Sequence, residues 1–131
     1  MSESAAVTAI WVLVADLFLR VRLEGLARRA GIPVRAFTDP QALVAGLDTA
    51  ASADARPRLV LIDLHAPHDA AFALLAALAA RAGAPPTLGF HSHVDVEIRD
   101  RATAAGCTRV VPRSAIMNRL ADLVAELSAG A

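Results

Sequence analysis

One aspartate and four histidines are the side chains best suited to chemistry, and they follow two short apolar segments. Asp63 ends the first segment, residues 59–62, and the second segment covers residues 87–90. The histidines follow the two segments in pairs and are His65, His68, His91 and His93. Imidazole and carboxylate groups bind Zn²⁺ and other divalent transition metals. A metal site, or a small metal-dependent or phosphate-handling enzyme built on these residues, is therefore one hypothesis.

The alternative is that the histidines are solvated loop residues with no ligand. Their spacing matches no metal-binding motif, and the sequence contains no glycine-rich phosphate loop, nucleophile elbow or HExxH motif. We therefore expect a protein that is not an enzyme and that holds no metal, with Asp63 and the four histidines kept as the candidate ligands.

The elements that position these residues alternate between strands and helices. Apolar, partly β-branched runs that are too short for helices predict buried strands, and leucine or valine at helical spacing predicts helices between them. We expect strands at residues 8–14, 34–37, 59–62, 87–90 and 108–111, and helices at residues 17–30, 40–47, 70–81, 94–105 and from 114 to about 127.

Capping signals support these helix boundaries. Asp39 before Pro40 predicts an N-cap, Asp69 or His68 is expected to cap the third helix, and Ser114 the last. A capping box is predicted for the fourth helix. Its two residues are Ser92 and Asp95.

Five strand–helix units predict an α/β fold with three layers, in which a parallel sheet is covered by helices on both faces. The flavodoxin-like strand order 2-1-3-4-5 is favoured. In that order the first and third strands are neighbours, so Asp16 and Asp63 are expected to lie together at the carboxyl edge of the sheet, where open α/β sheets bind their ligands.

This pattern resembles the receiver (CheY-like) domain of bacterial response regulators. The resemblance rests on five strand–helix units, an acid after the first strand, and Asp63 ending the third strand with Pro67 four residues later. It extends from about residue 8 to residue 127. It implies that Asp63 matches the aspartate that accepts a phosphoryl group and that Asp16 matches one member of the acidic pair that binds Mg²⁺.

Other positions depart from the receiver pattern. Ala15 and Leu17 are not acidic, so the acidic pair is incomplete, and at most weak Mg²⁺ binding is expected. His91 stands where receivers carry a serine or threonine. The lysine and the aromatic switch residue are replaced by Arg113 and Val110. Arg113 is expected to be a structural ion-pair partner of Asp63, because a guanidinium does not reproduce a compact ammonium.

The resemblance therefore implies a pseudo-receiver, a stand-alone domain of two-component signalling in which phosphorylation at Asp63 is absent or impaired. Such a domain acts by contact with a protein partner, which the sequence does not identify, or with a second copy of itself. Receivers commonly use the surface made by the fourth helix, fifth strand and fifth helix, and on the fourth helix Glu97 and Arg101 are spaced to form an i,i+4 pair.

Composition limits the remaining classes of function. With 13 basic and 13 acidic residues, the chain has no net field that attracts nucleic acid or a membrane surface. Cys107 is the only cysteine, which fits a reducing compartment, and we expect the cytoplasm. The 131 residues suit one domain, expected at residues 7–128, with frayed termini at 1–6 and 129–131.

Overall fold

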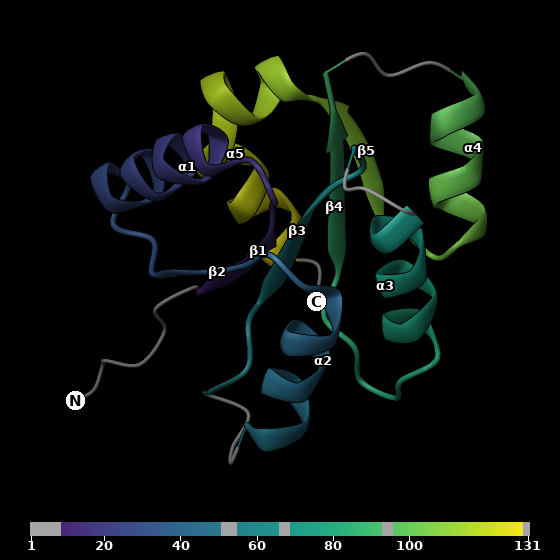
Figure 1. Cartoon of the computed structure of the whole chain (residues 1–131). Coiled ribbons are helices and arrows are strands. Elements are labelled where there is room, and N and C mark those ends of the chain that lie inside the picture. Colours follow the sequence, from purple (N-terminus) through teal and green to yellow (C-terminus); the bar gives the residue numbers. More distant parts are fainter. Residues whose placement is uncertain (1–8, 51–54, 66–68, 93–95, 130–131) are drawn as a thin grey trace.

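The computed structural model describes residues 9–50, 55–65, 69–92 and 96–129, and it shows strands and helices in strict alternation (Figure 1). The strands are β1 (Ile10–Leu13), β2 (Val34–Phe37), β3 (Leu59–Asp63), β4 (Thr87–His91) and β5 (Arg109–Pro112). The helices are α1 (Leu17–Arg29), α2 (Pro40–Thr49), α3 (Ala70–Ala79), α4 (Val96–Ala104) and α5 (Arg113–Ala129).

The strands form one parallel sheet in the order β2-β1-β3-β4-β5. Leu13 pairs with Ile62, and Asp63 pairs with Phe90, so the ends of β1, β3 and β4 lie at one edge. The predicted flavodoxin-like fold and its strand order are confirmed.

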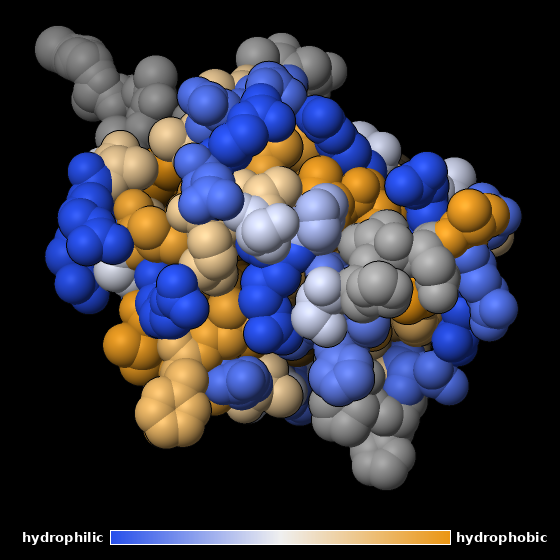
Figure 2. Space-filling view, turned by 90° about the horizontal axis from the view of Figure 1, so that it is seen from above, coloured by the Kyte–Doolittle hydropathy of each residue, from blue (hydrophilic) through white to orange (hydrophobic). Residues whose placement is uncertain are grey.

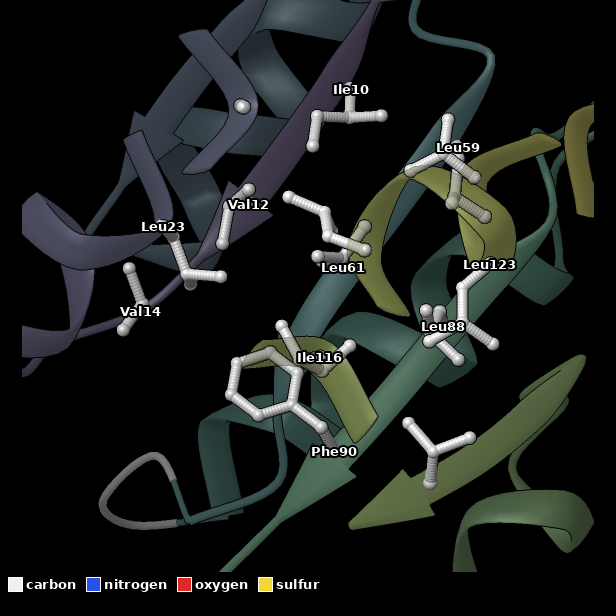
Figure 3. Close-up of a cluster of buried hydrophobic side chains, with 14 of the residues drawn as sticks. Ile10, Val12, Val14, Leu23, Leu59, Leu61, Leu88, Phe90, Ile116 and Leu123 are labelled. Carbon is white, nitrogen blue, oxygen red and sulfur yellow. The ribbon is translucent and has the colours of Figure 1, made fainter. Parts of the chain in front are cut away.

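Alternate side chains of the strands point to opposite faces of the sheet, and each face has its own core. Figure 1 shows α1 and α5 on one face and α2, α3 and α4 on the other. Figure 3 shows the first core, in which strand residues such as Val12, Leu61 and Phe90 meet Leu23 of α1 and Ile116 of α5. Because both faces are covered, β1 and residues 59–62 of β3 are apolar without interruption.

The second core contains the only tryptophan of the sequence. Trp11 is buried on β1, and its ring centroid lies 5.2 Å from that of Phe37 on β2. The guanidinium of Arg35 lies 5.1 Å from the centroid of the Trp11 ring. A Cβ atom at Gly46 would come within 3.1 Å of the indole, so glycine lets α2 approach it closely.

Helix α4 is attached mainly by surface contacts. Ala102 is its only buried residue. The guanidinium of Arg101 lies 4.0 Å from the centroid of the Phe72 ring on α3, and its Nη2 lies 2.9 Å from Oδ1 of Asp69. Arg101 therefore connects α4 to the start of α3.

Helix α5 is bent at Arg119, whose backbone dihedrals, φ −136° and ψ 30°, are not helical. Arg109 of β5 and Arg119 both donate hydrogen bonds to Glu126, at 2.8 and 2.9 Å. These contacts, the hydrogen bond from Arg109 first, hold the pKa of Glu126 below its usual range. The two arginines therefore tie the part of α5 after the bend to the bend itself and to β5.

Several predicted boundaries and caps are corrected. Asp39 caps α2 as predicted, by accepting a hydrogen bond from the Gln41 N–H. Asp69 precedes α3 with a left-handed backbone, φ 58°, and makes no capping hydrogen bond. Ser114 caps nothing, because α5 begins one residue earlier, at Arg113. His68 and Asp95 lie outside the described residues, so the predicted cap at His68 and the predicted Ser92–Asp95 capping box are not tested.

Candidate functional site

The candidate site lies at the carboxyl edge of the sheet, where β1, β3, β4 and β5 end and the chain turns into helices (Figure 1). Figure 2 looks onto this end of the molecule. The middle of the face is mostly hydrophilic, whereas hydrophobic side chains gather on the left, over the side that carries α1.

Asp63 is the buried carboxylate of this edge. It is the last residue of β3 and is 4% exposed. Its Oδ1 accepts a hydrogen bond from the backbone N–H of His65 at 2.9 Å, which fixes the start of the loop that follows β3. Leu64 N–H donates to the carbonyl oxygen of Phe90 at 2.8 Å and keeps the loop against β4. Asp63 is therefore held by backbone contacts made by its own loop and its neighbouring strand.

Two of the four histidines meet beside Asp63. His65 follows β3 and His91 ends β4, and their ring centroids lie 5.3 Å apart in an edge-on arrangement. His65 is exposed and His91 is half-buried. The predicted convergence of His65 and His91 is present, whereas His68 and His93 lie outside the described residues.

Asp16 has a structural role. Its Oδ1 accepts a hydrogen bond from the backbone N–H of Leu19 at 3.1 Å, which makes it the N-cap of α1. Asp16 is exposed, in contrast to Asp63. Since β1 and β3 are neighbours, both carboxylates follow adjacent strands, as predicted.

Arg113 does not play the predicted role. It is the first residue of α5 and is half-buried, and it forms no ion pair with Asp63. Its Nε is buried without a hydrogen-bond partner. Arg113 directly follows Pro112, the last residue of β5, which pairs with His91 of β4. Strand β4 therefore lies between the strand that precedes Arg113 and the strand that ends in Asp63. Val110 packs half-buried against the second core.

The residues do not fit a resident Mg²⁺ ion. Mg²⁺ requires an octahedron of oxygen ligands. Asp63 and Asp16 are the carboxylates that follow β3 and β1, and Asp16 is engaged at the start of α1. Within residues 9–50, 55–65, 69–92 and 96–129, no group of three or more His, Cys, Asp or Glu side chains could hold a metal ion.

Sequence reasoning missed two features of this region. It assigned Asp69 to a cap, but Asp69 instead pairs with Arg101 and joins the start of α3 to α4. It also gave no role to three apolar side chains that α1 exposes. Their signal was present, because they alternate with the buried positions Leu19, Leu23 and Ala27 at helical spacing.

Comparison with solved structures shows the receiver fold. A response regulator receiver protein from Burkholderia phymatum is 22% identical, with a TM-score of 0.77, over 93% of this chain and 95% of its own. A response regulator from Thermotoga maritima is 12% identical, with a TM-score of 0.78, over 94% and 98%. The Mn²⁺-bound form of response regulator Rcp1 is 15% identical, with a TM-score of 0.68, over 93% and 90%.

No protein-family model and no curated protein matches the sequence. The predicted resemblance to CheY-like receiver domains is thus confirmed for the fold. No described helix is long and apolar enough to cross a membrane.

Proposed function

We propose that this chain is a receiver-like signalling domain of two-component type, a pseudo-receiver that acts by protein contact and is a poor phosphoacceptor at Asp63. The receiver fold supports the signalling role. The single observation that carries the second part is the setting of Asp63. This carboxylate is buried among backbone contacts, and neither a second acid at position 15 nor an ammonium at position 113 stands at its edge of the sheet.

The chemistry of phosphoryl transfer explains why this setting is unfavourable. The transferred group carries negative charge, which a metal ion and fixed cations must offset as the oxygen of the acceptor attacks. Mn²⁺ is bound in the Rcp1 structure. In this chain the neighbouring acid, Asp16, caps α1, and the half-buried guanidinium of Arg113 forms no ion pair with Asp63. We propose a non-enzymatic, bacterial and cytoplasmic protein in which metal binding at this site is weak.

The test is intact-mass measurement after incubation with acetyl phosphate and Mg²⁺. We expect the unaltered chain to stay largely unmodified. The triple variant A15D/H91T/R113K restores the receiver residue types at the three positions and should gain a phosphoryl mass. The same triple variant with D63N is the matched control and should not. Rapid, near-complete modification of the unaltered chain that D63N abolishes would overturn the proposal.

The contact between His65 and His91 supports a second candidate, a transition-metal site, because imidazoles that meet beside a carboxylate suit such ions. A metal that binds only the folded state at about a hundred times its dissociation constant adds about 2.7 kcal/mol of stability. We expect no change in melting temperature with Zn²⁺, Ni²⁺ or Mn²⁺ at neutral pH. A reproducible rise that is lost in H91A and falls away under acidic conditions would favour the metal site.

A further inference from the structure

The amino edge of the sheet, opposite the candidate site, is where the chain enters β3 and β4 (Figure 1). The N–H of Val60 donates a hydrogen bond to the carbonyl oxygen of Pro86 at 3.0 Å, so the two entering segments lie side by side. Two cavities of about 280 and 410 Å³ open there, and residues 83–85 line both of them. Sites for small molecules have volumes of roughly 300–1,000 Å³, so the two adjoining cavities together are large enough for one.

Three arginines line these cavities, and two of them have no acidic partner among the described residues. Arg56 lines both cavities, Arg58 lines the larger one and Arg81 the smaller one. Arg81 pairs with Asp48 of α2. Neither Arg56 nor Arg58 forms an ion pair with any described residue. No acidic side chain within the described ranges lines either cavity, so the positive charges of these two arginines are not offset there.

The backbone that carries the two arginines is anchored to the sheet. Pro57 is buried between them, whereas Arg56 and Arg58 are exposed. The N–H of Arg58 donates a hydrogen bond to the carbonyl oxygen of Ala9 at 2.8 Å, and the proline ring restricts the backbone at position 57. A ligand therefore meets the arginines on a backbone that is already in place, which lowers the entropy lost on binding.

The loop after α3 forms the other wall of both cavities. Gly83 has a left-handed backbone, φ +69°, and a Cβ atom there would meet nothing within 4 Å, so the space beside it is open. Within the part of the chain that the structure describes, the N–H groups of Gly83 and Ala84 donate no hydrogen bond. Leu47 and Pro85 add apolar surface to the smaller cavity. The cavities thus combine cationic side chains and free backbone donors, which suit an oxyanion, with a wall that suits an organic group.

We propose that the two cavities form a binding site for a small organic phosphate, whose phosphate group is held by Arg56 and Arg58. Its organic group packs against the apolar wall at Pro85. A phosphate monoester carries close to two negative charges at neutral pH, which match the two unpaired guanidinium groups. Arginine binds phosphate through two parallel N–H···O hydrogen bonds. The site lies at the opposite edge of the sheet from Asp63 and does not depend on its phosphorylation, so this inference and the proposed function can fail separately.

Isothermal titration calorimetry of the full chain with phenyl phosphate tests the site, at about 0.15 M salt, which screens loose attraction to surface charge. We expect binding at a single site with a dissociation constant below about 1 mM. R56A and R58A should each weaken binding at least about tenfold, and their melting temperatures show whether they stay folded. R99A removes an exposed arginine of α4 that lines neither cavity and is the matched control, which should bind normally. Benzenesulfonate keeps the ring but carries a single charge, and it should bind more weakly.

Amide chemical shifts locate the bound phosphate. Phenyl phosphate should shift the amide signals of Gly83 and Ala84 and leave those of His65 and His91, at the other edge of the sheet, unchanged. A short oligothymidylate distinguishes a small phosphate from a nucleic-acid backbone, and we expect it to bind no more tightly than phenyl phosphate. Four results would each overturn the inference: no binding up to about 20 mM phenyl phosphate, equal losses in R56A and R99A, shifts centred on the carboxyl edge, or tighter binding of the oligothymidylate.

Discussion

Helix α4 precedes β5 and helix α5 follows it, yet the two helices are held against the sheet by different kinds of contact. Helix α5 buries Ile116, Leu120, Leu123 and Val124 against the first core. Helix α4 buries Ala102 and packs the half-buried Ile98 against the second core, and the exposed side chain of Arg101 contacts Phe72 and pairs with Asp69. Exposed ion pairs contribute about 0–1 kcal/mol, whereas each buried leucine is worth more.

This difference indicates where the molecule can change without unfolding. Local opening costs least where few apolar side chains are buried. We therefore expect α4 to open locally more readily than the sheet and α5. Opening of α4 would break the Asp69–Arg101 ion pair. This would link α4 to the loop after β3, because Asp69 lies between that loop and α3.

The largest expected effect comes from removing burial in α5. Leu123 is fully buried, so Leu123→Ala leaves a cavity in the first core and should lower the free energy of unfolding by about 3 kcal/mol. Val96→Ala on α4 is the exposed control and should change it by less than about 0.5 kcal/mol. Urea denaturation measures both. Equal losses would show that the two helices are attached alike.

The second prediction concerns the turn that ends α4. Gly106 has a φ of +103°, and a Cβ atom there would lie 2.7 Å from Cβ of Ala79 on α3. Gly106→Ala should therefore destabilise the fold by about 2 kcal/mol, through backbone strain and the clash. Gly83→Ala is the comparison, since it also has a positive φ but open space around it. The difference between the two unfolding free energies isolates the contact between α3 and α4.

A smaller global effect is expected for Arg101→Ala, about 1 kcal/mol or less, because both of its contacts are at the surface. The local effect should be larger. Amide hydrogen exchange in α4 should accelerate, while exchange in α5 stays unchanged. Arg99→Ala, at another exposed arginine of the same helix, should leave both unaffected. Unchanged exchange in R101A would show that Arg101 does not hold α4.

The smallest effect is a pH dependence at α5. The hydrogen bond from Arg109 lowers the pKa of Glu126 from its ordinary value of 4.5. The ionised pair therefore adds stability above that pH, and the contribution is lost as the pH falls through the lowered value. In Glu126→Gln this acid-dependent contribution should disappear. Melting temperature followed from pH 7 to about pH 3 measures it, and high salt should shrink the difference between the two proteins.

The sequence predicted the sheet well because strand and helix periodicity reflect burial directly. The run 59–62 is apolar throughout since β3 is covered on both faces, and Asp63 marks its end. The fourth helix was predicted to end at residue 105, and the structure ends α4 at Ala104, with Gly106 in the turn that follows. Asp39 beside Pro40 predicted the start of α2 correctly.

Contacts between surface side chains were not predictable in the same way. Arg101 has an acid at i−4, Glu97, but the partner it uses is Asp69 on another helix, which depends on how α4 is placed in three dimensions. The expected Asp63–Arg113 pair does not form, and Arg113 lies half-buried at the start of α5. The meeting of His65 and His91 was predictable because His65 follows β3 and His91 ends the neighbouring strand β4.

The position of Trp11 gives this protein a built-in optical reporter. The sequence has one tryptophan and no tyrosine, so a single indole dominates the ultraviolet-excited fluorescence. The indole is buried on β1 beneath α2, so its emission maximum should lie at short wavelength in the native state. The maximum should shift to longer wavelength when unfolding exposes the indole to water. Release of α4 alone should leave the indole covered and the wavelength of its emission maximum unchanged. Fluorescence and hydrogen exchange together can therefore distinguish loss of one helix from loss of the fold.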